Sequence, residues 1–280
     1  MRYEPQFAEL ARLREEDDPN LPMGDWERPL QKADWGQVAE ACIRILREDS
    51  KDFQIAAWLC DAWIRTGQAA GLRAGLGLIK AIAQQYWSSA WPAMTAGDTE
   101  RRIAPFIWLN SNLPLTIRLN VILIPTSLLR TQATTLRDWQ DAPLAEDTKS
   151  TISNKPSRRE IREKVTNSDR SWLARLAEDT AESIELLQHL TTYLEQQLNQ
   201  DAPSLTKLKS ELEQLQAAVS SLQQSLPLVA PDPNLESEAR SAAISNRAAK
   251  HTTTIYPIFC STEQASLFLK AKSMLIQCWN

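Results

Sequence analysis

Residues 86–110 read Tyr86-Trp87-Ser88-Ser89-Ala90-Trp91-Pro92, then a short loop, then Asp98-Thr99-Glu100-Arg101-Arg102-Ile103-Ala104-Pro105-Phe106-Ile107-Trp108-Leu109-Asn110. The stretch combines an aromatic helix end, a polar turn and a second helix that begins with an arginine pair. Asp98 and Thr99 are both residue types that cap helix starts. Pro105 is expected to bend the second helix, because it removes one backbone hydrogen bond. The stretch therefore predicts a corner between two helices, and it contains no catalytic motif.

The composition of the whole chain favours an all-α fold. Its 280 residues include only 7 glycines against 15 prolines, and Ala, Leu, Gln, Glu and Arg are abundant, which is typical of helices joined by proline-containing loops. A chain of this length can bury one large or two ordinary cores without disulfides or metals. We predict an antiparallel helical N-terminal domain followed by a long αα-hairpin domain.

Charge and cysteine usage exclude several classes of partner. The formal net charge of -4 and the sequence pI of about 5.4 argue against nucleic acid, which needs a concentrated basic face. The four cysteines are far apart in sequence and have no metal-ligand or redox spacing: Cys42, Cys60, Cys260 and Cys278. No apolar run approaches the roughly 20 residues that span a bilayer. We expect a soluble cytoplasmic protein with reduced thiols and no direct membrane insertion.

Capping residues define the helices of the first half. Asp34 is expected to cap a helix that ends near Glu48, and Asp52 to cap the next one. Gly67 is well placed to end that second helix in the left-handed conformation. Because the connections are short, neighbouring helices are predicted to run antiparallel.

A third helix is predicted from about residue 70 to residue 87, and it contains Gly71, Gly75 and Gly77. Glycines at this density suggest a phosphate-binding loop. We reject that interpretation, because no strand precedes them and no Lys-Ser/Thr pair follows. Small residues on one helix face instead predict close packing against another helix.

Five short patterns in this order resemble the N-terminal domain of the ImpA/TssA family of the bacterial type VI secretion system: Arg2-Tyr3-Glu4-Pro5-Gln6-Phe7, Asp34-Trp35-Gly36-Gln37-Val38, Ala56-Ala57-Trp58-Leu59, Tyr86-Trp87 with Pro92, and Arg101-Arg102-Ile103 with Trp108-Leu109-Asn110. The resemblance covers residues 1–140, since Thr135-Leu136-Arg137-Asp138 is similar to the end of that domain. It implies a cytoplasmic, non-enzymatic assembly factor without a cofactor. The implied partners are baseplate, tube, sheath or membrane-complex components of the secretion system.

The second half divides by composition. Residues 141–159 read as a linker, residues 160–227 as the αα-hairpin, residues 228–260 as a second linker and residues 261–280 as a terminal helix. The first hairpin helix is predicted to begin at Ser157 or Ser168 and to end at Leu198. The terminal helix is interpreted as a truncated domain or an assembly contact. Long family members continue into a ring-forming domain, for which we see no obvious counterpart here.

The second hairpin helix has the most regular apolar pattern of the chain. Its apolar residues alternate steps of three and four and form a leucine seam: Leu205, Leu208, Leu212, Leu215, Val219, Leu222 and Leu226. Such a seam packs either against helices of the same chain or against another copy. We favour self-association, and therefore a homo-oligomer, with an ordinary intrachain core as the alternative.

The aromatic and arginine residues of the corner are candidate protein-contact residues, because aromatic side chains and arginine dominate interface energetics. The arginine pair could also clasp a phosphate or carboxylate, or form ion pairs with acidic loops. For the tryptophans, the alternative to a role in protein contacts is packing in the core. The predicted protein interface comprises Trp87, Trp91, Arg101, Arg102 and Trp108.

Three classes of function are compatible with a helical chain of this length. An enzyme is disfavoured, because the only histidines are His189 and His251 and neither has a catalytic partner placed near it in sequence. A generic helical adaptor that binds peptides or partner helices is the alternative, although no repeat of about 34 or 40 residues is visible. A type VI secretion assembly or scaffold protein is the leading hypothesis.

Overall fold

The computed structural model of the protein describes residues 5–16, 32–94, 99–126, 132–143, 156–166 and 169–226. Their main helices are α1 (Pro5–Leu13), α2 (Trp35–Glu48), α3 (Phe53–Tyr86), α4 (Glu100–Asn120), α5 (Leu136–Asp141), α6 (Arg158–Glu163), α7 (Arg170–Leu198) and α8 (Thr206–Gln224). Two short strands, β1 (Ile122–Ile124) and β2 (Thr134–Thr135), pair antiparallel. The all-α prediction is confirmed. The predicted linker 228–260 and helix 261–280 lie outside the described residues.

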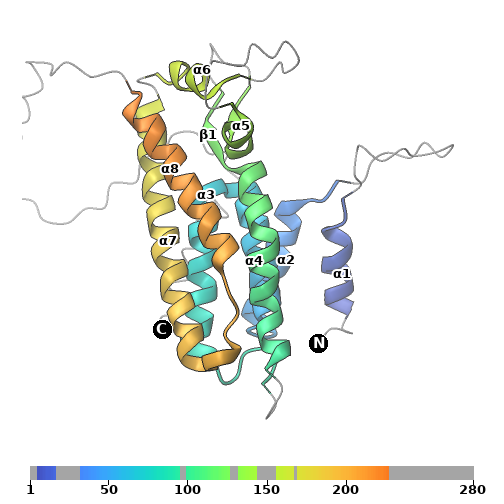
Figure 1. Cartoon of the computed structure of the whole chain (residues 1–280). Coiled ribbons are helices and arrows are strands. Elements are labelled where there is room, and N and C mark those ends of the chain that lie inside the picture. The colour runs from blue at the N-terminus through green and yellow to red at the C-terminus, as the bar shows by residue number, and fades with distance from the viewer. Residues whose placement is uncertain are drawn as a thin grey trace, which may run out of the picture. The chain divides into compact units, whose positions relative to one another are not determined.

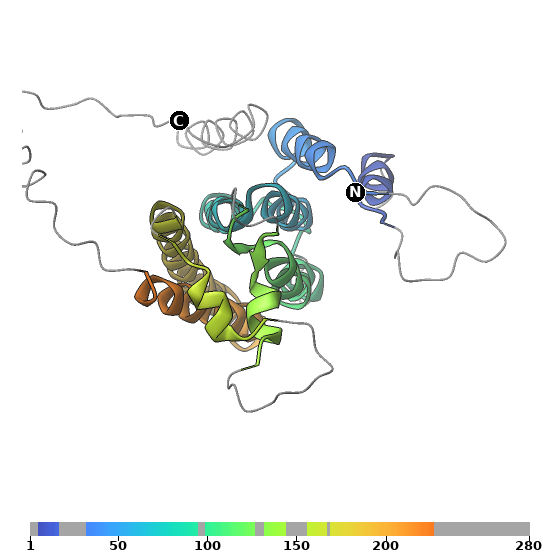
Figure 2. The same ribbon diagram turned by 90° about the horizontal axis from the view of Figure 1, so that it is seen from above.

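Residues 1–224 belong to one compact unit with α3 at its centre. α2, α4 and α7 all pack on α3, and α8 packs on both α7 and α4 (Figures 1 and 2). α1 lies at the edge of the bundle and packs on α2. The predicted αα-hairpin is therefore present as α7 and α8, and it packs on the N-terminal helices.

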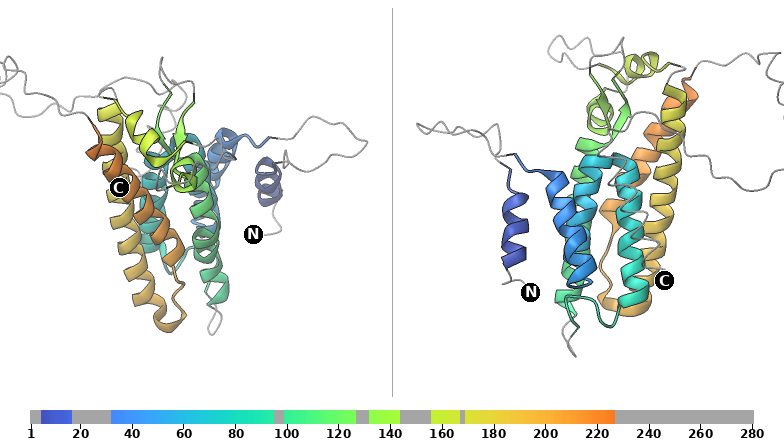
Figure 3. Two further views of the ribbon diagram at one scale, coloured as in Figure 1. Left: turned by 45° about the horizontal axis from the view of Figure 1, so that its top comes forward. Right: turned by 180° about the vertical axis from the view of Figure 1, so that it is seen from behind.

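α3 is two antiparallel helical rods joined by a tight turn. Gln68 has a positive φ of 56° and interrupts the helical geometry, and the two rods stand side by side in Figure 3. The predicted break is thus present, but the residue with a positive φ is Gln68 and not Gly67. The Gln68 side chain has a role that glycine lacks, since its Oε1 accepts a hydrogen bond from the Ile122 amide at 3.4 Å. This contact links the turn to β1.

Glycines bring the two rods of α3 into close contact, as predicted. A Cβ added at Gly71 would overlap the backbone carbonyl of Trp63, and one added at Gly75 would come within 2.9 Å of the Cys60 Cα atom. Both glycines are buried, as is the Cys60 thiol. Burial raises the pKa of Cys60, and it raises the pKa of Cys42 on α2 to about 12. These two thiols are core side chains.

The predicted N-caps of α2 and α3 are both present. The Asp34 carboxylate accepts from the Gln37 amide at 3.0 Å, and the Asp52 carboxylate accepts from the Gln54 amide at 2.7 Å. At α4 the N-cap residue is Thr99, but its side chain does not cap the helix. Its hydroxyl donates instead to Asp201 at 3.1 Å, which ties the start of α4 to the turn between α7 and α8.

The first hairpin helix follows the second of the two predicted starts, because the chain makes a separate short helix after Ser157 and α7 ends at Leu198 as predicted. Ser157 caps α6, which ends at Glu163, and α7 begins only at Arg170. Residues 164–166 and Asp169 separate them. α6 reaches α8 through a hydrogen bond from Arg162 to Ser221 at 3.1 Å.

The leucine seam lies inside the chain. Its buried members are Leu205, Leu208, Leu212, Leu215, Val219 and Leu222, while Leu226 lies just beyond the end of α8. α8 packs on α7 and α4, so the seam forms the intrachain core that was the alternative to self-association. An apolar stripe of this spacing does not itself specify whether its partner helix belongs to the same chain.

Polar contacts fix the hairpin on the N-terminal helices. Arg73 on α3 pairs with Asp179 at 3.0 Å and with Glu182 at 2.9 Å, both on α7. Arg118 on α4 pairs at 2.6 Å with Glu211, an almost fully buried residue of α8. A buried carboxylate is tolerated only when charged and hydrogen-bonding partners surround it. These pairs therefore specify how the hairpin docks.

We predict that Gly71→Ala lowers the free energy of unfolding by about 2 to 3 kcal/mol, because the new methyl group meets a backbone carbonyl that has no room to move. Gly77→Ala is the matched control. Its Cβ would meet only Leu186 Cδ1 at 3.9 Å, and alanine favours the helix by up to about 1 kcal/mol. Urea unfolding of the full chain measures both. Equal stability of the two variants would contradict the close contact within α3.

We predict that Leu212→Asp unfolds the chain, because a carboxylate would enter a fully buried position of α8. The control is Glu213→Asp, at an exposed position one residue away. Circular dichroism and light scattering measure folding and size together. A folded Leu212→Asp monomer, obtained from a wild-type oligomer, would show that the seam joins different copies.

Candidate functional site

Arg102 organises the corner between α3 and α4. The side chain is fully buried and donates to three backbone carbonyls: that of Pro92 at 2.7 Å, that of Trp87 at 2.6 Å and that of Ala90 at 2.8 Å. Its guanidinium also lies 4.9 Å from the ring centre of Trp87. Because the loop carbonyls would otherwise be left without donors, Arg102 fixes the path of residues 87–92.

Burial removes Arg102 from the predicted protein interface. Its pKa is lowered, mainly because burial disfavours the charged form, with the nearby Asp52 carboxylate acting in the opposite direction. Trp87 is half-buried and meets the Tyr193 ring of α7 at 5.7 Å. Arg102 and Trp87 therefore make their contacts within the chain. Of the predicted corner residues, Trp91 is 43% exposed and Arg101 is exposed.

Trp108 belongs to a second cluster, which the sequence did not reveal. A cavity of about 220 Å³ opens beside α4, and we call it the Asp61 cleft. Its wall comes from the end of α1, from α2 and from the facing surfaces of α3 and α4. The lining residues are Arg14, Glu16, Trp35, Asp61, Arg65, Trp108, Ser111, Asn112, Leu115, Thr116 and Leu119.

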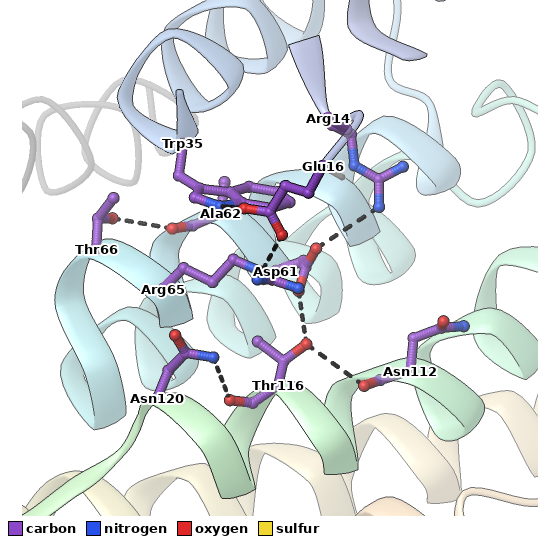
Figure 4. Close-up of polar contacts among 10 residues, drawn as sticks. All are labelled: Arg14, Glu16, Trp35, Asp61, Ala62, Arg65, Thr66, Asn112, Thr116 and Asn120. Atoms are coloured by element: carbon purple, nitrogen blue, oxygen red, sulfur yellow. Dashed lines mark hydrogen bonds and ion pairs between the residues drawn. The ribbon is translucent and has the colours of Figure 1, made fainter. Parts of the chain in front are cut away.

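Three side chains converge on the Asp61 carboxylate (Figure 4). Thr116 of α4 donates its hydroxyl at 2.8 Å, and Arg65, one turn along α3, donates Nε at 3.3 Å. Arg14, just after α1, approaches the other carboxylate oxygen at 3.6 Å. Asp61 is only 2% exposed. The carboxylate therefore ties together three segments that are distant in sequence.

Aromatic rings hold both arginines of the cleft. The Arg14 guanidinium lies 4.6 Å from the Trp58 ring and 5.3 Å from the Trp108 ring. Arg65 stacks on Trp35 at 4.0 Å, and the Trp35 indole nitrogen donates to Glu16 at 2.9 Å. Cations over aromatic faces are attracted by the ring quadrupole, more strongly when water is excluded.

The burial of Arg14 is only partly compensated by its neighbours. Burial lowers its pKa, and the Asp61 carboxylate offsets this effect only in part. Its Nε–H is buried and has no hydrogen-bond acceptor. A buried donor without an acceptor costs free energy, so the donor groups of Arg14 are not fully satisfied within the chain.

One face of α4 is apolar and exposed beside the cleft. Ile107 is 54% exposed, Leu115 is 57% exposed and Leu119 is 40% exposed. With Ser111 they occupy every fourth position, and residues spaced in this way lie on one side of a helix. We call these four residues the α4 ridge. Ser111, Leu115 and Leu119 also line the Asp61 cleft.

The arrangement offers N–H donors, carboxylates and an apolar surface for contacts with another molecule. Among the described residues, no three or more His, Cys, Asp or Glu side chains are grouped so that they could hold a metal ion. His189 lies exposed on α7. None of the helices in the described part of the chain combines the length and apolarity needed to cross a membrane.

Sequence reasoning missed the Asp61 cleft because its members come from four separate segments. The available signals were the Asp61 and Arg65 pair at i,i+4 and the apolar residues on the outer face of α4. Either signal alone is common on helices. Only the fold brings them together with Arg14.

Comparisons with known proteins give one consistent family. The family model described as "ImpA, N-terminal, type VI secretion system" matches residues 1–111. The type VI secretion system component TssA1 of Pseudomonas aeruginosa is 29% identical over 98 residues, which are 35% of this chain. That match spans 28% of the length of the curated relative.

A solved structure has the same fold. It is described as the N-terminal domain, including the conserved ImpA_N region, of the TssA component of the type VI secretion system from Burkholderia cenocepacia. The TM-score is 0.64 at 20% sequence identity, and the match covers 80% of this chain and 86% of that chain. The fold likeness therefore extends well beyond residue 111, into the second half of this chain.

We predict that Arg102→Met destabilises the chain by about 2 to 4 kcal/mol, because methionine fills much of the volume but leaves three carbonyls without donors. Arg101→Met is the matched control at the neighbouring, exposed position and should change stability by no more than about 0.5 kcal/mol. Thermal and urea unfolding measure both. If the two variants were equally stable, Arg102 would not hold the corner.

Proposed function

Residues 1–111 of this chain belong to the ImpA N-terminal family of type VI secretion systems, and from this premise we propose that the protein is a non-enzymatic assembly or scaffold component. It binds baseplate, tube or sheath components of the contractile tail, or the membrane complex, from the cytoplasmic side. The family match is the observation that carries this proposal.

The described site supports binding in preference to chemistry. The carboxylate of Asp61 is held by Thr116, Arg65 and Arg14, so it is a positioned anchor and not a free base. The apolar residues that reach the surface of α4 are of the kind that partner proteins cover. Trp91 and Arg101 at the corner provide a second proposed contact.

A helical adaptor outside the secretion system is the second candidate. The α4 ridge favours it, because a row of apolar residues at every fourth position suits a partner helix in any system. Self-association is also proposed. It has to use a surface other than the leucine seam, whose members in α8 are buried within the chain.

We predict that the tagged full chain co-purifies with tail, baseplate or membrane-complex components from a strain with an intact secretion cluster. Mild cross-linking followed by mass spectrometry identifies them, and the same tag on an unrelated helical protein is the control. Recovery of none of these components would contradict the proposed function. Recovery of unrelated helical proteins in their place would favour the adaptor.

A further inference from the structure

We propose that the α4 ridge and the Asp61 cleft together form a docking groove for an acidic amphipathic helix of a partner protein. The partner helix lays its apolar side chains along the ridge and places one carboxylate in the cleft. This inference rests on the proposed function only in taking the partner to be a protein of the secretion assembly. The groove itself follows from the described residues.

The ridge provides the apolar half of the groove. Ile107 and Leu115 are each more than half exposed, although both are large and apolar. Every fourth residue of α4 from position 107 to position 119 belongs to the ridge, and rows of this spacing form the ridges along which helices pack against each other. α4 also packs on α3, α8 and α5, and its residues Phe106, Leu109 and Leu113 are buried. The ridge is thus an exposed face of a helix whose buried residues pack against the bundle.

The cleft has the size of a pocket for one side chain. Its volume of about 220 Å³ is below the roughly 300–1,000 Å³ of pockets that hold cofactors and drug-sized ligands. Leu115 and Leu119 belong to both the ridge and the cleft, so the two features are continuous. A helix lying on the ridge therefore reaches the cleft with a single side chain.

The formal charges of the cleft balance, because Arg14 and Arg65 are ion-paired with Asp61 and Glu16, but its N–H donors outnumber its carboxylate oxygens. Two guanidinium groups offer about ten N–H donors. Asp61 pairs with both guanidinium groups and Glu16 pairs with Arg65. Asp61 also accepts from Thr116, and Glu16 also accepts from the Trp35 indole. The Nε–H of Arg14 has no acceptor. A carboxylate satisfies this surplus of donors, whereas a lysine or arginine would add to it.

The aromatic walls strengthen this preference. Trp58 and Trp108 flank Arg14, and Trp35 covers Arg65. Rings that exclude water lower the local dielectric constant, so a carboxylate that enters the cleft is attracted more strongly than one at an open surface. The preference is local, because the chain as a whole carries a net charge of -4 and would attract basic peptides at long range.

Three synthetic peptides test the proposal with the full chain. The first is an amphipathic helix with leucine at every fourth position and glutamate on one flank. The second carries glutamine in place of each glutamate, and the third carries lysine. Fluorescence anisotropy at physiological salt should give the tightest binding for the glutamate peptide, by at least about fivefold over glutamine. Equal binding of all three, or tightest binding of the lysine peptide, would overturn the proposal.

Substitutions locate the binding on the groove. Leu115→Asp should lower the affinity for the glutamate peptide at least about tenfold, and Ile107→Asp should do the same. Met94→Asp is the matched control, because Met94 is 44% exposed and lies outside the ridge. Circular dichroism verifies that each variant is folded, which is expected at exposed positions. An unchanged affinity in both ridge variants would overturn the proposal.

The same variants distinguish other occupants of the groove. If Leu115→Asp converts an oligomer of the full chain into a monomer, the groove binds a second copy and the partner assignment is overturned. A photoreactive p-benzoylphenylalanine at position 115 that cross-links within its own chain would overturn it as well. If secretion components co-purify equally well with wild type and with Leu115→Asp, the docking-groove proposal is overturned and the proposed function stands. If none co-purifies with wild type, the proposed function fails.

Discussion

The contact between the two rods of α3 sets the geometry of the bundle. Two glycines let the backbones approach so closely that no side chain fits between them, and Gln68 reverses the chain between the rods. α2, α4 and α7 are then placed by the surfaces that this pair presents. The first rod carries Asp61 toward α4, and the second carries Arg73 toward α7. Both the candidate site and the docking of the hairpin therefore depend on one close helix contact.

Charged groups inside this bundle act as positioning devices. Arg102 satisfies loop carbonyls, Asp61 joins three segments, and Glu211 connects α8 with α4 and with Gln140 of α5. Each has several partners, as a buried charge requires. Such groups contribute little net stability compared with apolar packing, but a wrong arrangement of the helices would leave them unpaired. They therefore favour one packing of the helices over the alternatives.

Local patterns predicted the helices well, because capping, glycine packing and apolar spacing are decided within a few residues. Asp34, Asp52 and the close packing at Gly71 and Gly75 were confirmed for this reason. The turn residue was wrong by one position, since Gln68 is held by a distant amide that the local sequence does not reveal. The role of Arg102 was missed because its acceptors are backbone carbonyls, which have no sequence signal. The Asp61 cleft and the intrachain location of the leucine seam likewise depend on which helices meet.

The match to the family ends at residue 111, inside α4, which continues to Asn120. The compact unit, in contrast, includes residues up to 224. The stretch that identifies the protein is therefore only part of what must fold together. A fragment cut at the family boundary would break α4 in the middle, remove Thr116 from the Asp61 carboxylate and uncover the face of α3 that α7 protects. For this protein, the boundary of recognisable ancestry and the boundary of the compact unit are different positions in the chain.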